Sequence, residues 1–244
     1  MSRVLATYNI KGGVGKTSAA VNLATLAARE GRRTLLWDLD PQGASTYLFR
    51  VKPKIKGGGG KLVRGKTDVD AQLKGTDIEG LDLLPADFSY RHMDLALGDA
   101  KKPERRLARV LQPLEDDYDF TFLDCPPSIS LVSESVFDAA DALLVPIIPA
   151  TLSSRTLDQL HGVLDRKGPQ VLGFFSMADR RKKLHRELME SLAAEYDLLQ
   201  TVIPTSAEIE RMGAHRAPIT EFAPRSRAAR AYADLWDEIR ARLT

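Results

Sequence analysis

A glycine-rich stretch near the start of the chain, KGGVGKTS at 11–18, contains the residue types needed to surround a phosphate group. Its glycines let backbone N–H groups turn toward anionic oxygens, and a helix that begins directly afterwards adds the positive end of its dipole. Lys16 would then reach the outer phosphates of a nucleotide, and the Thr17 hydroxyl would bind Mg²⁺. The stretch therefore predicts a nucleotide-binding phosphate loop.

A second stretch, GKLVRGKT at 60–67, matches the strict pattern G-x-x-x-x-G-K-[ST], whereas the first has Ile10 in place of the leading glycine. The flanking residues decide between the two, because a phosphate loop needs a strand before it and a helix after it. An apolar run at 3–9 precedes the first stretch, and the helix-forming TSAAVNLATLAARE follows it. The second lies between a glycine- and lysine-rich segment and the polar DVDAQLKG, so we interpret this match as accidental.

Two further segments carry acidic residues where a nucleotide-binding sheet needs them. DFTFLD ends in Asp124, and LLWDLDPQG contains Asp38 and Asp40. The carboxyl ends of parallel strands meet at one edge of a sheet, where ligands bind. Asp124 is placed to hold magnesium or its water shell. Taken alone, such aspartates are also common helix caps and turn formers, but beside a phosphate loop they indicate a Mg-nucleotide site.

Short apolar runs alternate with amphipathic segments along the whole chain. Several runs are apolar almost without interruption, which is typical of strands buried on both faces of a parallel sheet. The expected strands are 3–9, 33–39, 81–86, 119–124, 142–148, 170–176 and 200–204. One face of an expected helix at 227–244 carries Tyr232, Leu235, Trp236, Ile239 and Leu243. The order predicts a single α/β domain over 1–244, a doubly wound, mostly parallel sheet with helices on both faces.

One segment, VKPKIKGGGGKLVRGK at 51–66, departs from this alternation. It has no acidic residue and contains four consecutive glycines, so we expect a flexible basic loop that buries little. Its positive charge would allow contact with DNA or with a partner protein. A mobile, solvated loop would have the same composition.

The composition narrows the class of protein. Among 244 residues, 43% are hydrophobic and 28% charged, which is ordinary for a globular protein with a sizeable core. The formal net charge is +2, so attraction to nucleic acid must come from a local patch. The single cysteine, Cys125, excludes an internal disulfide and a cysteine-only metal cluster within one chain. No apolar run approaches the ~18 residues of a membrane span and the start lacks a signal-peptide layout, so we expect a cytoplasmic protein.

Three motifs in this order, KGGVGKTS, DLDPQG and LDCPPS, resemble the ParA/MinD family of P-loop ATPases with the deviant Walker A motif, and its ParA/Soj branch most closely. VIPTSAEIE and FAPRSRAARAYADL resemble further segments of the family, so the resemblance covers nearly the whole chain. It implies slow, partner-stimulated hydrolysis of ATP with Mg²⁺ as cofactor. The nucleotide-binding residues that it implies are Lys11, Gly12, Gly13, Val14, Gly15, Lys16, Thr17, Ser18, Pro204 and Ser206.

The resemblance also implies a role for the extra lysine, Lys11. In the family this lysine crosses a homodimer interface and touches the phosphates held by the other subunit, so that two subunits enclose two ATP molecules. A second cation there would neutralise charge that develops at the γ-phosphate. The implied catalytic residues are Lys11, Lys16 and Asp40, with Asp40 positioning the attacking water. The implied metal-site residues are Thr17, Asp38 and Asp124.

Two further regions of the site follow from the same resemblance. Asp124, Pro126, Pro127 and Ser128 match switch II, the segment that senses the γ-phosphate. Pro204 matches the family proline beside the adenine, and Ser206 stands where the family commonly has an asparagine. A serine offers one rotatable hydroxyl rather than a fixed amide. We interpret Cys125, within switch II, as a small packing residue.

A basic run, MADRRKKLHRE at 177–187, is the first candidate for a DNA-binding surface, and we expect it to open a helix. Clustered lysines and arginines neutralise phosphates and release counterions, which gives sequence-independent, salt-sensitive affinity. In ParA relatives the matching stretch contributes to non-specific DNA binding, with Arg181 as the nearest counterpart. The candidate contacts are Arg180, Arg181, Lys182, Lys183, Arg186, Arg211, Arg216, Arg225 and Arg227. A solvated helix start is the alternative interpretation of the same run.

The resemblance implies a partition ATPase that dimerises with ATP, binds nucleoid DNA and is stimulated by a ParB-like protein or a cargo adaptor. Its cargo would be a plasmid, a chromosome or a protein assembly, and no membrane partner is expected. A membrane-surface ATPase similar to MinD is the main alternative, but it needs an additional amphipathic basic helix. A metabolic enzyme on the same fold is a third class, which would leave the DLDPQG and DCPPS motifs and Lys11 unexplained.

Overall fold

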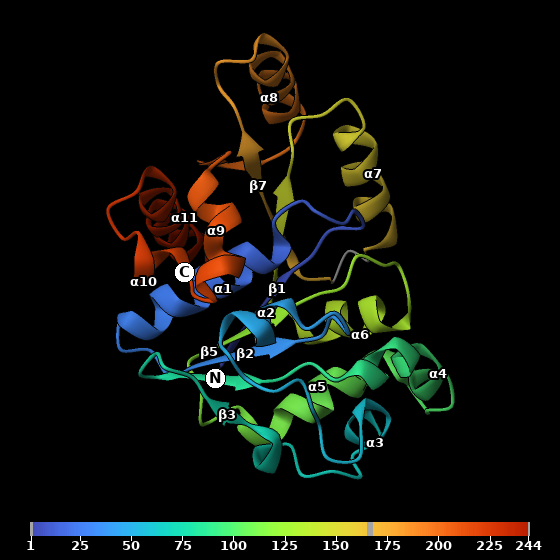
Figure 1. Ribbon diagram of the computed structural model, residues 1–244. Coiled ribbons are helices and arrows are strands. Elements are labelled where there is room, and N and C mark those ends of the chain that lie inside the picture. Colours follow the sequence, from blue (N-terminus) through green and yellow to red (C-terminus); the bar gives the residue numbers. More distant parts are fainter. Residues whose placement is uncertain (1, 165–167, 244) are drawn as a thin grey trace.

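The computed structural model describes residues 2–164 and 168–243, and in this part of the chain an eight-stranded sheet lies between two layers of helices (Figure 1). The strand order is β3-β4-β2-β5-β1-β6-β7-β8, and all neighbours are parallel except β3 and β4. The strands are β1 Arg3–Thr7, β2 Thr34–Asp38, β3 Lys74–Gly75, β4 Leu81–Leu84, β5 Phe120–Asp124, β6 Ala142–Ile147, β7 Gln170–Ala178 and β8 Leu198–Pro204.

Helices cover both faces of this sheet. They are α1 Lys16–Arg29, α2 Ala44–Leu48, α3 Gly59–Val63, α4 Met93–Gly98, α5 Arg106–Leu111, α6 Leu131–Ala139, α7 Ser153–Val163, α8 Lys183–Glu195, α9 Ala207–His215, α10 Ile219–Phe222 and α11 Arg227–Leu243. Short 3-10 helices lie at Asp70–Gln72, Phe88–His92, Pro103–Arg105 and Gln112–Leu114. The apolar cores place α1, α2, α9, α10 and α11 on one face and α3 to α8 on the other.

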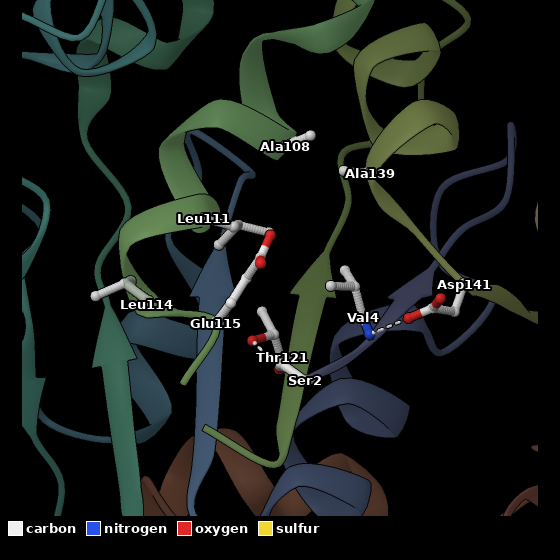
Figure 2. Close-up of a pocket in the computed structure, with 9 residues that line it drawn as sticks. All are labelled: Ser2, Val4, Ala108, Leu111, Leu114, Glu115, Thr121, Ala139 and Asp141. Atoms are coloured by element: carbon white, nitrogen blue, oxygen red, sulfur yellow. Dashed lines mark hydrogen bonds between the residues drawn. The ribbon is translucent and has the colours of Figure 1, made fainter. Parts of the chain in front are cut away.

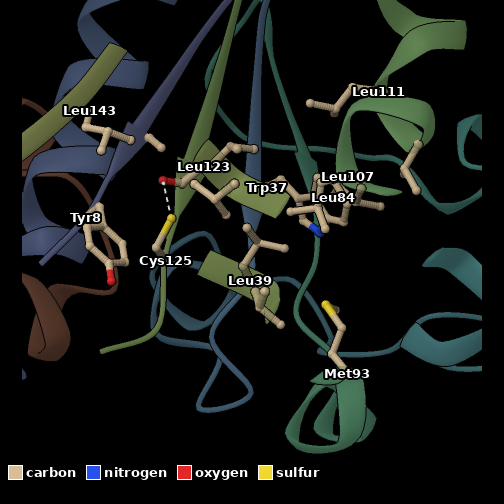
Figure 3. Packing of buried hydrophobic residues seen from close by; sticks show 14 of the residues in the cluster. Tyr8, Trp37, Leu39, Leu84, Met93, Leu107, Leu111, Leu123, Cys125 and Leu143 are labelled. Atoms are coloured by element: carbon tan, nitrogen blue, oxygen red, sulfur yellow. Dashed lines mark hydrogen bonds between the residues drawn. The ribbon is translucent and has the colours of Figure 1, made fainter. Parts of the chain in front are cut away.

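The strands are apolar on both sides because both of their faces are covered. In β2, Leu35 and Trp37 belong to one core and Leu36 to the other, as the two-residue period of a strand requires. All three side chains are fully buried. Figure 3 shows the first of these cores, in which Trp37, Leu84 and Leu123 pack from neighbouring strands. The doubly wound, mostly parallel sheet expected from the sequence is thus confirmed.

The pairing register brings the ends of three strands to one point. Thr7 at the end of β1 lies opposite Asp124 at the end of β5, and Asp124 lies opposite Asp38 at the end of β2. Both aspartates therefore reach the same carboxyl edge of the sheet, beside the loop that leaves β1. This is the edge at which open α/β sheets bind ligands.

All seven expected strands form, and the structure adds the two-residue β3. The expectation that 51–66 buries little is wrong. Part of this segment forms α3, and Ile55, Leu62 and Val63 are almost fully buried. The glycines make this possible, because a Cβ at Gly59 would lie 2.3 Å from the ring of Tyr90. The lysines of the segment remain on its exposed side.

The start of helix α8 also differs from expectation. The basic run at 177–187 was expected to open a helix, but β7 continues to Ala178 and α8 begins only at Lys183. The residues between them form a tight turn, in which Lys182 N–H donates to the carbonyl oxygen of Asp179. Across 2–164 and 168–243, none of the helices is both long enough and apolar enough to span a bilayer.

Candidate functional site

The loop between β1 and α1 has the geometry of a phosphate-binding loop. Gly13 and Gly15 adopt positive φ angles of 70° and 98°, and Gly15 directly precedes the first residue of α1. A Cβ at Gly15 would lie 2.8 Å from Ser176 Oγ, so both its conformation and its surroundings require glycine. Asn9 fastens the loop to β6, because its amide donates to the carbonyl oxygen of Pro146 and its Oδ1 accepts from Lys11 N–H. The N-terminus of α1 thus ends at a fixed, glycine-lined turn.

The strict pattern at 60–67 does not form such a loop. Here the helix, α3, begins before the Gly-Lys-Thr sequence rather than after it, and α3 ends at Val63. The element that precedes α3 in the chain is the helix α2, not a strand. The interpretation of this match as accidental is consistent with the structure.

The two lysines of the loop differ in their surroundings. Lys16 is buried, and its ammonium donates a 2.8 Å hydrogen bond to the carbonyl oxygen of Lys11. Burial lowers the pKa of Lys16, and the carboxylate of Asp124 opposes this shift. Lys11 is partly exposed, and its ammonium donates to the carbonyl oxygen of Leu152, 3.2 Å away. Lys16 therefore faces into the site, whereas Lys11 extends along its rim.

Two buried carboxyl groups lie at the sheet edge beside this loop. Asp38 and Asp124 have no exposed surface, and burial raises the pKa of each above that of an ordinary aspartate. The neighbouring charge of Asp124 raises the pKa of Asp38 further. Asp38 Oδ2 accepts from the backbone N–H and the hydroxyl of Thr46, and Asp124 Oδ2 accepts from Ser45 Oγ at 2.7 Å. The sequence analysis did not identify either hydroxyl residue, although both lie within three residues of the end of the DLDPQG motif.

The residues at this edge fit a bound magnesium ion. Asp124 Oδ1 is buried and has no well-formed hydrogen bond, and the Thr17 hydroxyl lies near enough to lower the pKa of Asp124. Oxygen donors of this kind suit Mg²⁺, which uses one or two protein ligands together with phosphate and water. Asp38 has both oxygens engaged by protein donors, so it suits an outer position better. Within 2–164 and 168–243, no cluster of three or more His, Cys, Asp or Glu side chains could bind a metal by itself.

A cleft of about 360 Å³ adjoins the phosphate loop. The residues that line it include Lys16, Thr17, Asp40, Pro127, Met177, Ile209 and Glu210. Asp40 is partly exposed there, with Oδ1 accepting from Gln42 N–H. The cleft therefore joins the phosphate loop, the expected water-positioning aspartate and switch II.

The adenine-binding role expected for Pro204 and Ser206 stays a prediction. Pro204 is buried at the end of β8, and Ser206 is the N-cap of α9, where its hydroxyl bonds with Glu208. Neither residue is among those that line the cleft, whereas Ile209 and Glu210 of α9 are. Ile209 and Glu210 could have been identified from the sequence by their position about one helical turn after the N-cap residue Ser206.

The segment expected to form switch II packs directly against the phosphate loop. A Cβ at Gly12 would lie 3.9 Å from the ring of Pro127, and Tyr8 OH donates to the carbonyl oxygen of Ser128 at 2.7 Å. Ser133 on α6 donates to the same carbonyl. Cys125 is buried, its thiol donates weakly to the carbonyl oxygen of Leu123, and burial raises its pKa (Figure 3). These features suit a packing residue rather than a reactive thiol.

A second cavity, of about 180 Å³, lies at the opposite edge of the sheet, where β1 and β5 begin (Figure 2). Ser2, Val4, Thr121 and Glu115 line it, and Asp141 on its wall accepts from the backbone N–H of Val4. None of the expected site residues lies there. The phosphate-loop cleft is therefore the candidate site despite the presence of this cavity.

The expected DNA contacts do not form a single cluster. Arg180 and Arg227 line one groove together with Arg230, which the sequence reasoning missed. Arg181 is 92% exposed at its side chain and pairs with Asp179, and this pairing lowers the pKa of Asp179 to about 2. Two other candidates already have partners within the protein. Arg186 donates to the carbonyl oxygens of residues 180 and 181, and Lys183 pairs with Glu187.

Arg216 lies apart from this groove, at the end of α9. Its guanidinium stacks on the ring of Tyr47, 4.4 Å from the centroid, and its Nε donates to the carbonyl oxygen of Tyr47. Arg211 and Arg225 are exposed, as is Lys182. The structure thus brings Arg180 and Arg227 to one groove, which Arg216 does not line.

A parallel sheet with a glycine loop, a lysine and a helix N-terminus at its carboxyl edge defines a P-loop nucleotide-binding protein. The comparisons with known proteins agree, since the AAA domain family matches residues 2–167. The sporulation initiation inhibitor protein Soj of Bacillus subtilis is 32% identical, with 99% of each chain covered. The chromosome-partitioning ATPase Soj of Treponema pallidum is 30% identical, with 99% of this chain and 98% of that one covered.

A solved structure shares the fold over nearly the same length. Cobyrinic acid a,c-diamide synthase of Mycobacterium smegmatis, with bound ATP analogue and magnesium, is 29% identical with a TM-score of 0.80, covering 97% of this chain and 93% of that one. The full-length relatives and the motifs together place the chain in a narrower group. The chain belongs to the ParA/Soj family of P-loop ATPases.

Proposed function

We propose that this chain is a partition or positioning ATPase that uses ATP and Mg²⁺, dimerises around ATP and binds DNA without sequence preference. The observation that carries this proposal is the convergence of Lys16, Thr17, Asp40 and Asp124 around one glycine loop, with a second lysine, Lys11, on its rim. The chromosome-partitioning name of a full-length relative supports the cellular role.

Different residues of the chain have different roles in the proposed hydrolysis of ATP. The loop amides and Lys16 bind the β- and γ-phosphates, and burial of Lys16 strengthens its interaction with them. Thr17 and Asp124 would hold Mg²⁺, which would supply positive charge to neutralise the phosphates. Asp40, partly exposed in the same cleft, accepts a hydrogen bond from the attacking water and orients it.

The position of Lys11 supports the proposed dimerisation. Its ammonium is at the rim of the loop rather than in the cleft, and its own carbonyl already accepts from Lys16. A partly exposed cation there can approach the nucleotide of a second copy, and ATP between two copies links dimerisation to the nucleotide state. Leu152 and Ile129, 59% and 53% exposed, are apolar residues that a second copy would cover.

DNA binding is proposed for the groove with Arg180, Arg227 and Arg230 and for the exposed turn that carries Arg181. The proposed affinity is electrostatic and therefore sensitive to salt. A partner protein would raise the hydrolysis rate and release the dimer, so that the protein forms gradients on the nucleoid and positions a cargo.

Light scattering with size-exclusion chromatography in Mg-ATP and in Mg-ADP tests the proposal, alongside ATP turnover. We expect a dimer with ATP, a monomer with ADP, and slow turnover. Lys16→Ala is the matched negative variant, because removing the buried ammonium should weaken ATP binding by at least about a hundredfold. A wild-type protein that stays monomeric with both nucleotides, or a Lys16→Ala variant that hydrolyses ATP normally, would contradict the proposal.

A further inference from the structure

The short helix α2 follows directly after the loop that carries Asp40. Gly43, with a positive φ of 67°, lets the chain turn into this helix, and its N–H donates to the carbonyl oxygen of Asp40. The helix spans only Ala44–Leu48. Two of its residues, Ser45 and Thr46, are fully buried, so their hydroxyl groups need hydrogen-bond partners inside the protein.

Ser45 and Thr46 hold the two buried carboxyl groups of the site. Ser45 Oγ donates to Asp124 Oδ2 over 2.7 Å, although the two residues are 79 positions apart in the chain. Thr46 donates twice to Asp38 Oδ2, from its hydroxyl at 2.7 Å and from its backbone N–H at 2.8 Å. Thr46 Oγ1 also accepts from the N–H of Ala86 after β4, so its proton can point only toward Asp38.

The consequence for Asp124 is an ordered carboxyl group. With Oδ2 engaged by Ser45, the group cannot rotate freely, and Oδ1 is left buried without a well-formed hydrogen bond. A buried oxygen in this state is available to a cation or to a water of its shell. Without the Ser45 hydroxyl, Oδ2 would lose its partner and either oxygen could face the metal position.

The outer side of α2 is also held. Arg216 stacks on Tyr47 and donates to its carbonyl oxygen, while Arg50 donates to the carbonyl oxygen of Arg216 and pairs with Asp77. Arg50 and Arg216 both have positive φ angles, 60° and 48°, which non-glycine residues adopt at a cost. These contacts fix α2 against α9, so that its inner hydroxyls meet the carboxyl groups in one arrangement.

We propose that Ser45 and Thr46 are positioning residues for the ATPase reaction. Ser45 orients Asp124 so that Oδ1 serves the magnesium ion, and Thr46 holds Asp38 beside it. The inference rests on the proposed Mg-nucleotide site and adds to it the two residues that preorganise its carboxyl groups. Each hydroxyl is directed at a carboxyl group, so its proposed action on nucleotide and metal is indirect.

The test measures how nucleotide binding depends on Mg²⁺. N-methylanthraniloyl-ATP is titrated with wild-type protein in EDTA and over a range of Mg²⁺ concentrations. The Mg²⁺ midpoint is the Mg²⁺ concentration at which half of the Mg-dependent gain in nucleotide binding is reached. Ser45→Ala should raise this midpoint by about tenfold or more, which is the usual loss of metal affinity when a metal ligand loses its supporting hydrogen bond. Its affinity for the nucleotide in EDTA should stay within about twofold of wild type, because a general loss of structure would lower both.

Ser135→Ala is the matched control. Ser135 is also fully buried and its hydroxyl accepts from Leu107 N–H, but it lies on α6 away from the carboxyl groups, so its Mg²⁺ midpoint should equal that of wild type. Thr46→Val and Thr46→Ser form a second pair. Valine keeps the shape and loses the hydroxyl, so its midpoint should rise, whereas serine should retain most of the wild-type behaviour.

The outcomes are separable. A Ser45→Ala midpoint equal to that of wild type overturns the positioning role, and so does an equal loss of affinity with and without Mg²⁺. Wild-type protein that binds the nucleotide without any effect of Mg²⁺ also overturns it. Wild-type protein that binds no nucleotide in either condition overturns the proposed function itself, and this inference with it.

Discussion

The ammonium group of Lys11 donates a hydrogen bond to the carbonyl oxygen of Leu152, 3.2 Å away in the same chain. The bond holds the extra lysine along the rim of the phosphate loop, next to an apolar side chain that is 59% exposed. A lysine that serves a second copy must leave this carbonyl, which costs little because the bond is exposed to solvent. Lys11 is therefore free to change partners when ATP is bound.

Lys11→Ala should abolish ATP-dependent dimerisation and leave ATP binding by the monomer within about threefold of wild type, because Lys16 and the loop amides remain. Light scattering and calorimetry measure the two properties. Lys61→Ala, which removes an exposed lysine outside the site, serves as the control. A dimer that forms normally without Lys11 would show that this lysine only solvates the edge of the loop.

Asp40→Ala should bind ATP, hydrolyse it at least about a hundredfold more slowly, and accumulate as a dimer. The physical reason is the loss of the carboxylate that orients the attacking water, while the groups that bind phosphate are untouched. Single-turnover hydrolysis and light scattering on the same sample measure both effects. Rapid turnover by this variant would remove Asp40 from the catalytic residues.

Arg181→Ala should weaken DNA binding at every salt concentration and reduce the slope of log K against log salt by about 1, as expected for one lost phosphate contact. Its present partner, Asp179, is negatively charged at neutral pH, and the pairing lowers the pKa of Asp179 further, to about 2. Asp179→Asn should therefore free Arg181 and strengthen DNA binding. If both variants behave as wild type on DNA and in ATP-driven dimerisation, the basic turn is only a solvated surface.

Arg216→Ala should lower the free energy of unfolding by about 1 kcal/mol, because its stacking on Tyr47 and its hydrogen bond to the Tyr47 carbonyl are lost. Arg211→Ala, on the exposed side of the same helix, should leave stability within about 0.5 kcal/mol. Urea unfolding monitored by circular dichroism measures both. Equal stability of the two variants would mean that Arg216 does not anchor α2, and would return it to the candidate DNA contacts.

The sheet was predictable because its strands are buried on both faces, so that nearly continuous apolar runs such as LLW in β2 mark them. The two-residue β3 carries Lys74 and Gly75 and has no such signal. The burial of 51–66 was not predictable, because it depends on glycines that admit Tyr90 and on Asp87, which accepts from Ile55 N–H across 32 positions. Contacts of that range leave no local pattern in a single sequence.

The phosphate loop and its aspartates could also be found from the sequence, because a glycine-rich loop, a lysine and acidic residues at the ends of buried strands rarely occur together outside nucleotide-binding sites. Ser45 and Thr46 could not, because serine and threonine are common after a turn and only the register of β2 and β5 brings their partners together. The binding role predicted for Ser206 remains a prediction, and its cap bond to Glu208 competes with it. The predicted DNA contacts do not gather in one groove, because the order of charges along a sequence does not encode their distances in the fold.

The most direct test of the central claim is the anisotropy of a fluorescent random-sequence DNA duplex titrated with this protein, in parallel with Mg-ATP and with Mg-ADP. The account predicts strong binding with ATP alone, weakening steeply as salt rises. Equal binding with both nucleotides, or no binding with either, would contradict it. Co-sedimentation with anionic lipid vesicles under the same conditions would then show whether a membrane surface takes the place of DNA.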